Sequence, residues 1–265
     1  MTQADLAQNL AIDARGLTKR YRRGVFTAST LRDEFSGLFS ARSEAQEDAH
    51  HFFALKDVSF TLPRGTICGI LGRNGSGKTT LMKILAAITE PTDGEAHLFG
   101  RVSCLLEVGA GFDVELTGLD NIYLNGAILG MSRAEVTAKL DRIVAFADIG
   151  PVLDTQVKRY SSGMYTRLAF ALAVNLDSEI ILLDEVLAVG DISFREKCVA
   201  AMKELAAQGR AIMFVSHNMD LVRSVCDRAV LLDKGRLLAA GPVDVVAERY
   251  LDMVRSDPPP VADAG

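Results

Sequence analysis

Tryptophan is absent from the 265 residues, and aromatic residues of all kinds make up only 6% of them. Cysteine is also scarce. It occurs at Cys68, Cys104, Cys198 and Cys226, and no two of these form a C-x-x-C pair. This spacing argues against a zinc site and against a disulfide framework. It predicts buried free thiols in a reducing compartment.

Long apolar runs and an excess of basic residues are missing as well. No apolar run approaches the ~20 residues that a membrane-spanning helix needs. The N-terminus lacks the basic region and the apolar stretch of a secretory signal. Because acidic residues outnumber basic ones and the net charge is −5, no electrostatic argument favours nucleic acid as a partner. We expect a cytoplasmic protein that meets a membrane only through a partner.

What the sequence does contain is a phosphate-loop pattern after a short apolar run. Residues 67–71 are apolar and typical of a buried parallel strand, and apolar residues recur at helical spacing after Lys78. The turn between them fits the pattern G-x-x-x-x-G-K-[ST]. The eight residues of the pattern are Gly72, Arg73, Asn74, Gly75, Ser76, Gly77, Lys78 and Thr79, and Thr80 follows them in the expected site.

The residue types of this turn suit phosphate chemistry. Glycines let backbone N–H groups approach phosphate oxygens without a Cβ in the way, and the helix N-terminus adds its positive end. Lys78 reaches the β- and γ-phosphates, and the Thr79 hydroxyl ligates Mg²⁺. The pattern therefore predicts a nucleoside triphosphate site over residues 72–80.

Strand-like and helix-like segments alternate along the chain, which predicts an α/β fold with a parallel sheet. Ligand groups are then expected at the carboxyl ends of the strands. Fully apolar strands are expected at 67–71, 180–183 and 211–215, a short strand at 12–17 and an alternating strand at 54–62.

Two helices carry start signals of their own. Ser132 with Glu135, and Ser193 with Glu196, each fit a capping box, in which two side chains satisfy N–H groups at the helix start. Helical spacing dominates the middle of the chain, and we expect a helical subdomain over about 110–175, inserted into the α/β core.

Residues 22–51 interrupt the strand pattern near the start of the chain. Within them Leu31, Phe35, Leu38 and Phe39 fall on one face of a short helix, and acidic residues with two histidines follow. Two interpretations remain open. The helix packs on its own domain, or it docks on a membrane or a partner.

The strand at 180–183 ends in two carboxylates. Asp184 can hold Mg²⁺, or one of its waters, opposite Thr79. The adjacent Glu185 can polarise an attacking water as general base. We predict a metal ligand followed directly by a catalytic base.

A histidine follows the strand at 211–215. His217 there is expected to contact the γ-phosphate. Because parallel strands end at one edge of a sheet, Glu185, His217 and Lys78 are expected to form one catalytic group.

The segment Tyr160-Ser-Ser-Gly-Met164 completes a known order of motifs. With it, the chain resembles the ATP-binding subunit of an ABC transporter over about residues 12–250. The family's signature usually reads Leu-Ser-Gly-Gly-Gln, and this segment keeps the serine and the second glycine. The resemblance implies a P-loop NTPase fold of the ABC type with an inserted helical subdomain and an antiparallel β edge. It also implies ATP hydrolysis with Mg²⁺.

The same resemblance implies a second copy of the chain as partner. Ser161, Ser162 and Gly163 at a helix start would hold the γ-phosphate of ATP bound on the opposite subunit. Asp191 matches the family's aspartate that reaches across the dimer. The implied assembly is a head-to-tail homodimer with two ATP molecules between the chains.

Two further positions take their roles from the resemblance. Tyr21 stands where the family places an aromatic ring against adenine, with Phe52 or Phe53 as alternatives. Glu107 stands where the family usually has a glutamine that ligates Mg²⁺ or water, and its carboxylate could serve in that role.

Three features together resemble the exporters of bacterial surface polysaccharides, of O-antigen, capsule, teichoic acid and galactan types. They are the segment Tyr-Ser-Ser-Gly-Met, the stretch LLEVGAGFDVELTGLDNIYLNG and the insertion at 22–51. The resemblance implies export of a lipid-linked polysaccharide, with two separate permease subunits, at the cytoplasmic face of the bacterial inner membrane. A small-solute transporter and a soluble non-transport ABC ATPase are the alternatives.

The expected organisation is one ATP-binding domain over 11–255. A polar tail is expected at 1–10, and a disordered tail at 256–265.

Overall fold

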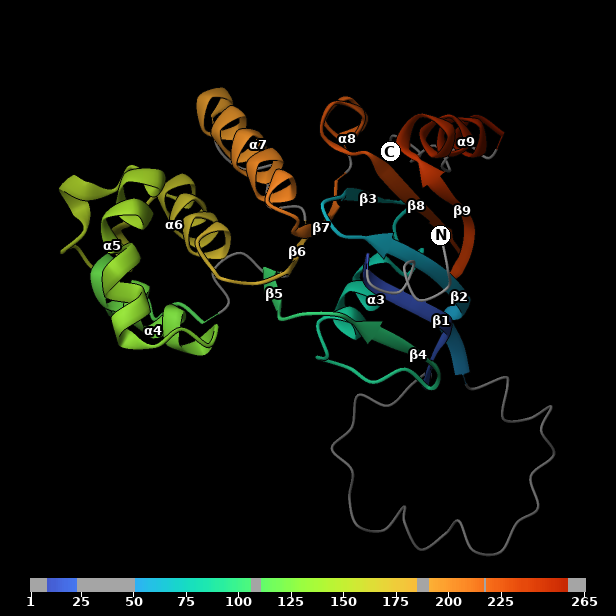
Figure 1. The fold of residues 1–265 in the computed structure, drawn as a ribbon, viewed down its shortest axis with the longest axis horizontal. Helices are drawn as coiled ribbons and strands as arrows, with labels where there is room; N and C mark the ends of the chain where they lie inside the picture. Colours follow the sequence, from blue (N-terminus) through green and yellow to red (C-terminus); the bar gives the residue numbers. More distant parts are fainter. Residues whose placement is uncertain (1–8, 23–50, 106–110, 185–190, 217, 257–265) are drawn as a thin grey trace, which may run out of the picture.

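The computed structural model describes residues 9–22, 51–105, 111–184, 191–216 and 218–256. In this part of the chain, two sheets with their helices form one lobe and a group of helices forms another (Figure 1). The helices of the second lobe are α4 (Gly118–Ile128), α5 (Arg133–Ala147) and α6 (Ser162–Val174), with the 3-10 turns η2 (Gly150–Val152) and η3 (Val157–Arg159). None of the described helices is both long and apolar enough to cross a bilayer.

The larger sheet has six strands. They are β3 (Ile67–Leu71), β5 (Val102–Leu105), β6 (Ile180–Asp184), β7 (Ala211–Val215), β8 (Arg228–Asp233) and β9 (Arg236–Pro242). Their order is β5-β6-β7-β3-β8-β9, and the pair β8-β9 is antiparallel while the other pairs are parallel. The predicted α/β fold with an antiparallel edge is confirmed.

A second sheet is antiparallel and has three strands in the order β2-β1-β4. They are β1 (Leu10–Arg22), β2 (His51–Pro63) and β4 (Asp93–Leu98). β1 is longer than the strand predicted at 12–17, because it pairs with β2 from one end to the other. Such pairing supplies backbone hydrogen bonds that the local hydrophobic pattern does not reveal.

Helices lie against both sheets. They are α3 (Lys78–Leu85), α7 (Ile192–Ala207), α8 (Met219–Val225) and α9 (Val243–Ser256). In Figure 1, α7 stands between the two lobes, and α8 and α9 lie together beside β8 and β9. The helices of the second lobe fall within the range in which the sequence predicts a helical subdomain.

The strand β3 shows why the central strands read as unbroken apolar runs. Ile67 and Leu71 pack in the layer that includes α7 and α8, whereas Cys68 and Ile70 pack in the layer that includes α3 and β1. A strand buried on both faces needs apolar residues at every position rather than at alternate ones. All five residues of β3 are buried.

Side-chain caps start the helices α4 to α8. The capping box of Ser132 and Glu135 at α5 is confirmed. The box predicted at Ser193 and Glu196 is wrong, because α7 begins earlier, with Asp191 as its N-cap. The Asp191 carboxylate accepts the backbone N–H that a cap has to satisfy, and this places Ser193 inside the first turn. The N-caps are Thr117, Ser132, Ser161, Asp191 and Asn218.

All four cysteines are free thiols. Cys68, Cys198 and Cys226 are buried, as predicted, and Cys104 is half-buried. Burial raises the pKa of Cys68 and of Cys198 to about 12, and it also raises the pKa of Cys226 and of Cys104.

We expect Ellman's reagent at pH 8 to modify Cys104 first in the native protein. The other three thiols should stay unmodified while the fold persists, because the thiolate is the reactive form and burial disfavours it. In denaturant all four should react at once. Cys104→Ser is the control and should remove the fast phase, and fast reaction of all four native thiols would contradict the buried placement.

Candidate active site

The sheet order brings the predicted strand ends to one edge. β7 lies between β6 and β3, and the three strands run parallel. In register, Asp184 of β6 is opposite Val215 of β7, which is opposite Ile70 of β3. Neighbouring strands are about 4.8 Å apart, so Asp184 is two strand spacings from Ile70, which lies two residues before the phosphate loop.

Two glycines let the phosphate loop pack closely against its neighbours. Gly72 has φ 147° and Gly77 has φ 106°, both in the region that favours glycine. A Cβ on Gly72 would lie 2.3 Å from the Leu232 carbonyl oxygen, and one on Gly77 would lie 2.4 Å from the Ala54 carbonyl oxygen. Close approach of the backbone therefore requires glycine at both positions.

Hydrogen bonds within the phosphate loop, and others that link it to both sheets, hold it in place. Lys78 Nζ donates to the Gly72 carbonyl at 2.8 Å. The backbone N–H of Gly235, in the turn between β8 and β9, donates to the Ser76 carbonyl at 3.0 Å. The Gly235 carbonyl in turn accepts from the N–H of Lys56 on β2 at 2.8 Å. The loop is fixed where both sheets meet.

The loop offers donors of the kind that phosphate oxygens accept. Gly77 is the N-cap of α3 and makes no side-chain cap bond, and the N-terminus of a helix is a favourable position for an anion. Ser76 is 2% exposed, and its Oγ has no hydrogen-bond partner among the described residues. A Cβ on Gly72 would lie 2.5 Å from this oxygen, which places it inside the loop. An uncapped helix start and a buried hydroxyl fit a bound phosphate group.

The predicted metal ligands have the right chemistry. Thr79 is exposed in the first turn of α3, and Asp184 is half-buried at the end of β6. A hydroxyl and a carboxylate oxygen suit Mg²⁺, which takes few protein ligands and completes its shell with water and phosphate. Among the described residues no cluster of three His, Cys, Asp or Glu could hold a metal, and Mg²⁺ on a triphosphate does not need one. Of the other loop residues, Asn74 is exposed and Thr80 is half-buried.

Several predicted groups lie outside the described residues. Their roles stay predictions, although the chain around them is placed. Asp184, at the end of β6, directly precedes Glu185. Asn218 directly follows His217 and caps α8, with its side-chain oxygen accepting from the Leu221 N–H at 3.0 Å. The groups outside the described residues are Glu107, Glu185, His217, the helix predicted within 22–51 and most of the two tails.

The aromatic residues predicted for the base lie close to the phosphate loop. Tyr21 lies one residue before the end of β1, opposite Phe52 of β2, and their ring centroids are 5.7 Å apart. Phe52 is 43% exposed. Two residues further along β2, the Ala54 carbonyl lies against Gly77. The assignment of the base contact to Tyr21, with Phe52 or Phe53 as alternatives, stays a prediction.

The signature residues start the helix α6. Ser161 caps it, with its Oγ accepting from the Met164 N–H at 3.2 Å, and the hydroxyl proton remains for a ligand. Ser161 and Ser162 are exposed and Gly163 is half-buried. They belong to the helical lobe, whereas the phosphate loop belongs to the sheet lobe (Figure 1). One chain therefore places the two predicted phosphate-binding segments in different lobes.

A role for Arg167, which follows the signature on α6, was missed. Its guanidinium forms ion pairs with Asp191 and, at 3.4 Å, with Asp148. The Phe194 N–H, and then Arg167, hold the pKa of Asp191 below its ordinary value. The partners are 19 and 24 residues away in the sequence, so local spacing gives no signal for this cluster.

Two buried asparagines of α4 were missed as well. Asn121 Oδ1 accepts from the Asp113 N–H at 2.8 Å, and its Nδ2 donates to the Asp113 carbonyl at 2.8 Å. Asn125 Nδ2 donates to the Gly111 carbonyl at 3.2 Å. These bonds anchor the loop before α4 and give a structural reason for both asparagines in the stretch LLEVGAGFDVELTGLDNIYLNG.

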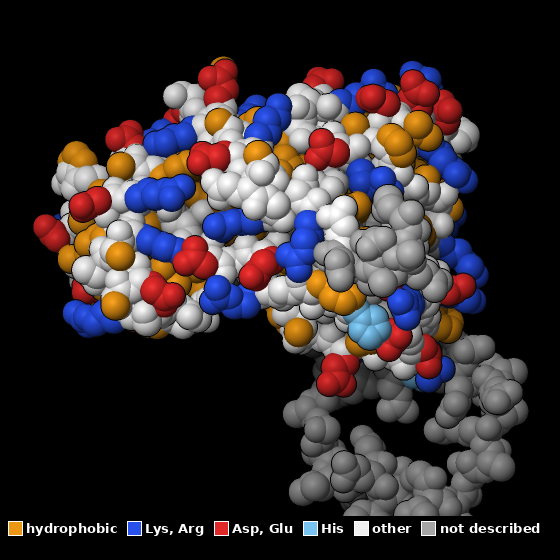
Figure 2. Space-filling model, in the orientation of Figure 1, with side chains coloured by type: hydrophobic (Ala, Val, Ile, Leu, Met, Phe, Trp, Pro, Cys, Tyr) orange, Lys and Arg blue, Asp and Glu red, His pale blue; other side chains and the backbone are white. Residues whose placement is uncertain are grey.

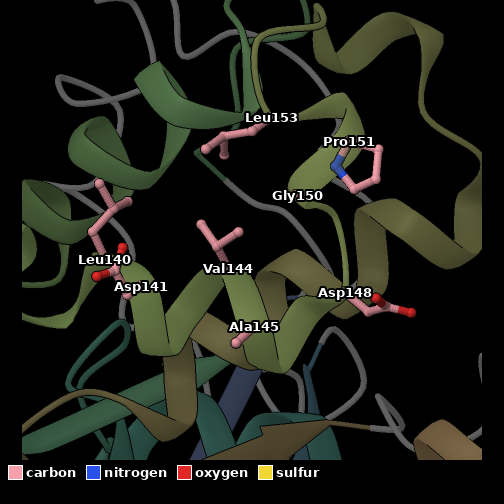
Figure 3. Close-up of a pocket in the computed structure, with 8 residues that line it drawn as sticks. All are labelled: Leu140, Asp141, Val144, Ala145, Asp148, Gly150, Pro151 and Leu153. Atoms are coloured by element: carbon pink, nitrogen blue, oxygen red, sulfur yellow. The ribbon is translucent and has the colours of Figure 1, made fainter.

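A hollow of about 330 Å³ opens on the helical lobe (Figure 3). Figure 3 shows the side chains of Leu140, Val144 and Leu153 turned toward it. None of its lining residues belongs to the predicted nucleotide site. The lining residues are Leu140, Asp141, Val144, Ala145, Asp148, Gly150, Pro151 and Leu153.

Comparison with known proteins decides the family. The sequence profile described as "ABC transporter" matches residues 55–188, half of the chain. The chain belongs to the ABC transporter family. This ABC chain also superposes with a TM-score of 0.70 on a dimeric ATP-binding cassette in a post-hydrolysis state bound to ADP and phosphate. That structure is 20% identical and covers 88% of this chain and 98% of its own, and the likeness shows the ABC fold.

Two curated relatives are more similar in sequence. The O-antigen export system ATP-binding protein RfbB of Myxococcus xanthus is 44% identical over 231 residues, which cover 87% of this chain and 52% of the relative. The protein of the same name from Klebsiella pneumoniae is 42% identical over 199 residues, which cover 75% of this chain and 81% of the relative. This ABC chain thus spans about half the length of the Myxococcus protein.

We expect Gly72→Ala to weaken ATP binding at least ~10-fold and to destabilise the fold by about 1–3 kcal/mol, since the new Cβ would strain the backbone against β8. Nucleotide titration and thermal unfolding measure the two effects. Gly130→Ala is the matched control, because Gly130 has φ 86° but nothing within 4 Å of a Cβ. It should lower stability and leave ATP binding unchanged. Equal loss of ATP binding in both variants would contradict the role of close packing at Gly72.

Proposed function

We propose that this chain is the ATP-hydrolysing subunit of an exporter that moves a lipid-linked polysaccharide across the bacterial cytoplasmic membrane. The observation that carries the proposal is the alignment of the phosphate loop with Asp184 at one sheet edge. The identity with two O-antigen export proteins supports the substrate class.

Binding of ATP follows from the loop. The first-turn N–H groups of α3, the Ser76 hydroxyl and Lys78 Nζ donate to the phosphate oxygens. Thr79 and Asp184 are the residues that would hold Mg²⁺, which when bound neutralises charge on the phosphates. The loop keeps its shape through bonds to both sheets, so little reorganisation is needed when ATP arrives.

Hydrolysis requires a base at the end of β6. Glu185 directly follows Asp184 and takes the proton of the attacking water in this proposal. His217, at the end of the neighbouring strand β7, contacts the γ-phosphate. Both follow strands whose carboxyl ends lie at the edge that carries the phosphate loop.

A second copy of the chain completes the site. Ser161, Ser162 and Gly163 lie at a helix start, a position that favours anions, and they lie in the lobe away from the chain's own phosphate loop. In a head-to-tail homodimer they would face the ATP of the partner subunit, together with Asp191. The likeness to a dimeric cassette is consistent with this arrangement.

The transport path belongs to other chains in this proposal. Two integral membrane permease subunits carry the lipid-linked glycan, and the ATPase dimer binds them at the cytoplasmic face. Lys, Arg, Asp and Glu side chains are interspersed on the face shown in Figure 2. Together with the net charge of −5, this distribution favours a protein partner over nucleic acid.

Glu185→Gln should bind ATP normally and hydrolyse it at least ~100-fold more slowly, in line with the contribution of a general base. A phosphate-release assay and nucleotide titration measure this. Glu179→Gln, at the opposite end of β6, is the matched control and should keep its turnover, since an amide oxygen still accepts from the Arg101 N–H. Lys78→Ala should lose ATP binding.

Near-normal turnover of Glu185→Gln would refute the base assignment. Unchanged affinity of Lys78→Ala would refute the phosphate-loop assignment.

Depletion of this protein in its source cell should trap the lipid-linked glycan. The expected result is accumulation at the cytoplasmic face of the membrane and loss from the cell surface. Re-expression of the wild-type chain should restore export, and re-expression of Lys78→Ala should not. Surface glycan that persists after depletion would overturn the polysaccharide assignment and favour a different cargo.

A further inference from the structure

Arg167 joins the two lobes of the chain. It lies on α6 of the helical lobe, and its guanidinium pairs with Asp191, the N-cap of α7. The same guanidinium lies 3.4 Å from Asp148, which caps the C-terminus of α5. Helices from both lobes thus meet on one side chain.

The guanidinium is held by packing as well as by charge. Its Cζ lies 5.2 Å from the centroid of the Phe194 ring. Phe194 is 6% exposed and packs edge-on against Phe146 and Phe170. An arginine stacked on a ring and bonded through its fork has a fixed orientation, which lysine does not reproduce.

Asp191 depends on this arrangement. One carboxylate oxygen accepts from the Phe194 N–H at 2.8 Å, and the other accepts from Arg167. Arg167 lies four residues after Gly163 on α6, which is about 6 Å along the helix axis. The signature end of α6 and Asp191 are therefore connected through one rigid turn of helix and one ion pair.

We propose that Arg167 is a positioning residue of the ATPase, which fixes Asp191 relative to the N-terminus of α6 so that both reach the second copy of the chain together. This inference rests on the proposed function, since it takes the signature residues to act on ATP bound by the partner subunit. Loss of Arg167 leaves the phosphate loop of the same chain intact and misaligns the surface offered to the other.

A second contact between the two lobes provides the control. Lys197 Nζ on α7 donates to the Ala145 and Phe146 carbonyls at the end of α5, at 3.0 and 2.9 Å. It joins the lobes without touching Asp191. Lys197→Ala therefore measures what general loosening of the two lobes does.

Asp148→Asn isolates the other arm of Arg167. Asp148 has φ 55°, a conformation that asparagine also tolerates. Figure 3 shows its carboxylate directed away from Leu140 and Leu153, and asparagine has nearly the same size, so the hollow that Asp148 helps to line keeps its shape. Asp148→Asn removes the ion pair between Arg167 and Asp148 and keeps the ion pair between Arg167 and Asp191.

The experiment measures four quantities for each full-length variant. They are the ATP affinity of the single chain, the ATP-driven dimerisation in a Glu185→Gln background, and kcat and KM in the native background. We expect Arg167→Ala to keep its ATP affinity and KM within ~2-fold, to dimerise at least ~10-fold more weakly and to lose at least ~10-fold in kcat. The dimerisation and the kcat of Arg167→Lys should lie between those of Arg167→Ala and those of the wild type.

The double variant Arg167→Ala with Asp191→Asn tests the route of the effect. If Arg167 acts through Asp191, the double variant should dimerise no more weakly than Asp191→Asn alone, because the two side chains form one unit. Lys197→Ala and Asp148→Asn should dimerise and turn over within about 3-fold of the wild type.

Three results would overturn the inference: normal dimerisation of Arg167→Ala, an equal loss in Lys197→Ala, or additive losses in the double variant. If Arg167→Ala does not fold, wild-type dimerisation of Arg167→Lys overturns it instead. Failure of the proposed function looks different, because the unsubstituted chain would then not bind ATP, or would not dimerise with ATP in the Glu185→Gln background.

Discussion

The parallel pairing of β7 with β3 on one side and with β6 on the other is the constraint on which the site depends. It sets Asp184, Val215 and Ile70 in one row, although they are far apart in the sequence. A slip of one residue would turn every side chain of a strand to the opposite layer, and burial on both faces prevents it. The phosphate loop and the acidic strand end therefore share an edge.

Much of the fold could be predicted because its signals are local. The buried strands at 67–71, 180–183 and 211–215 show as unbroken apolar runs, and Ser132 with Glu135 marks the start of α5 within four residues. The three-stranded sheet could not be predicted. Its partners meet only after the chain folds, and the full length of β1 depends on its pairing with β2.

The candidate site, too, could be predicted only where its signals are local. The loop from Gly72 to Thr79 is one continuous segment, and its motif was visible in the sequence. The packing that fixes the loop was not visible, because Ala54 on β2 and Gly235 in the turn between β8 and β9 come from distant parts of the sequence. Arg167 was missed for the same reason, since both of its carboxylate partners come from distant segments.

The most direct measurement is a crystal structure of the chain with a non-hydrolysable ATP analogue and Mn²⁺ in place of Mg²⁺, with the metal located by its anomalous signal. We expect the triphosphate along Gly72 to Thr79 and the metal within reach of the Thr79 hydroxyl and Asp184. A metal peak away from both residues, or nucleotide in the hollow on the helical lobe, would contradict it.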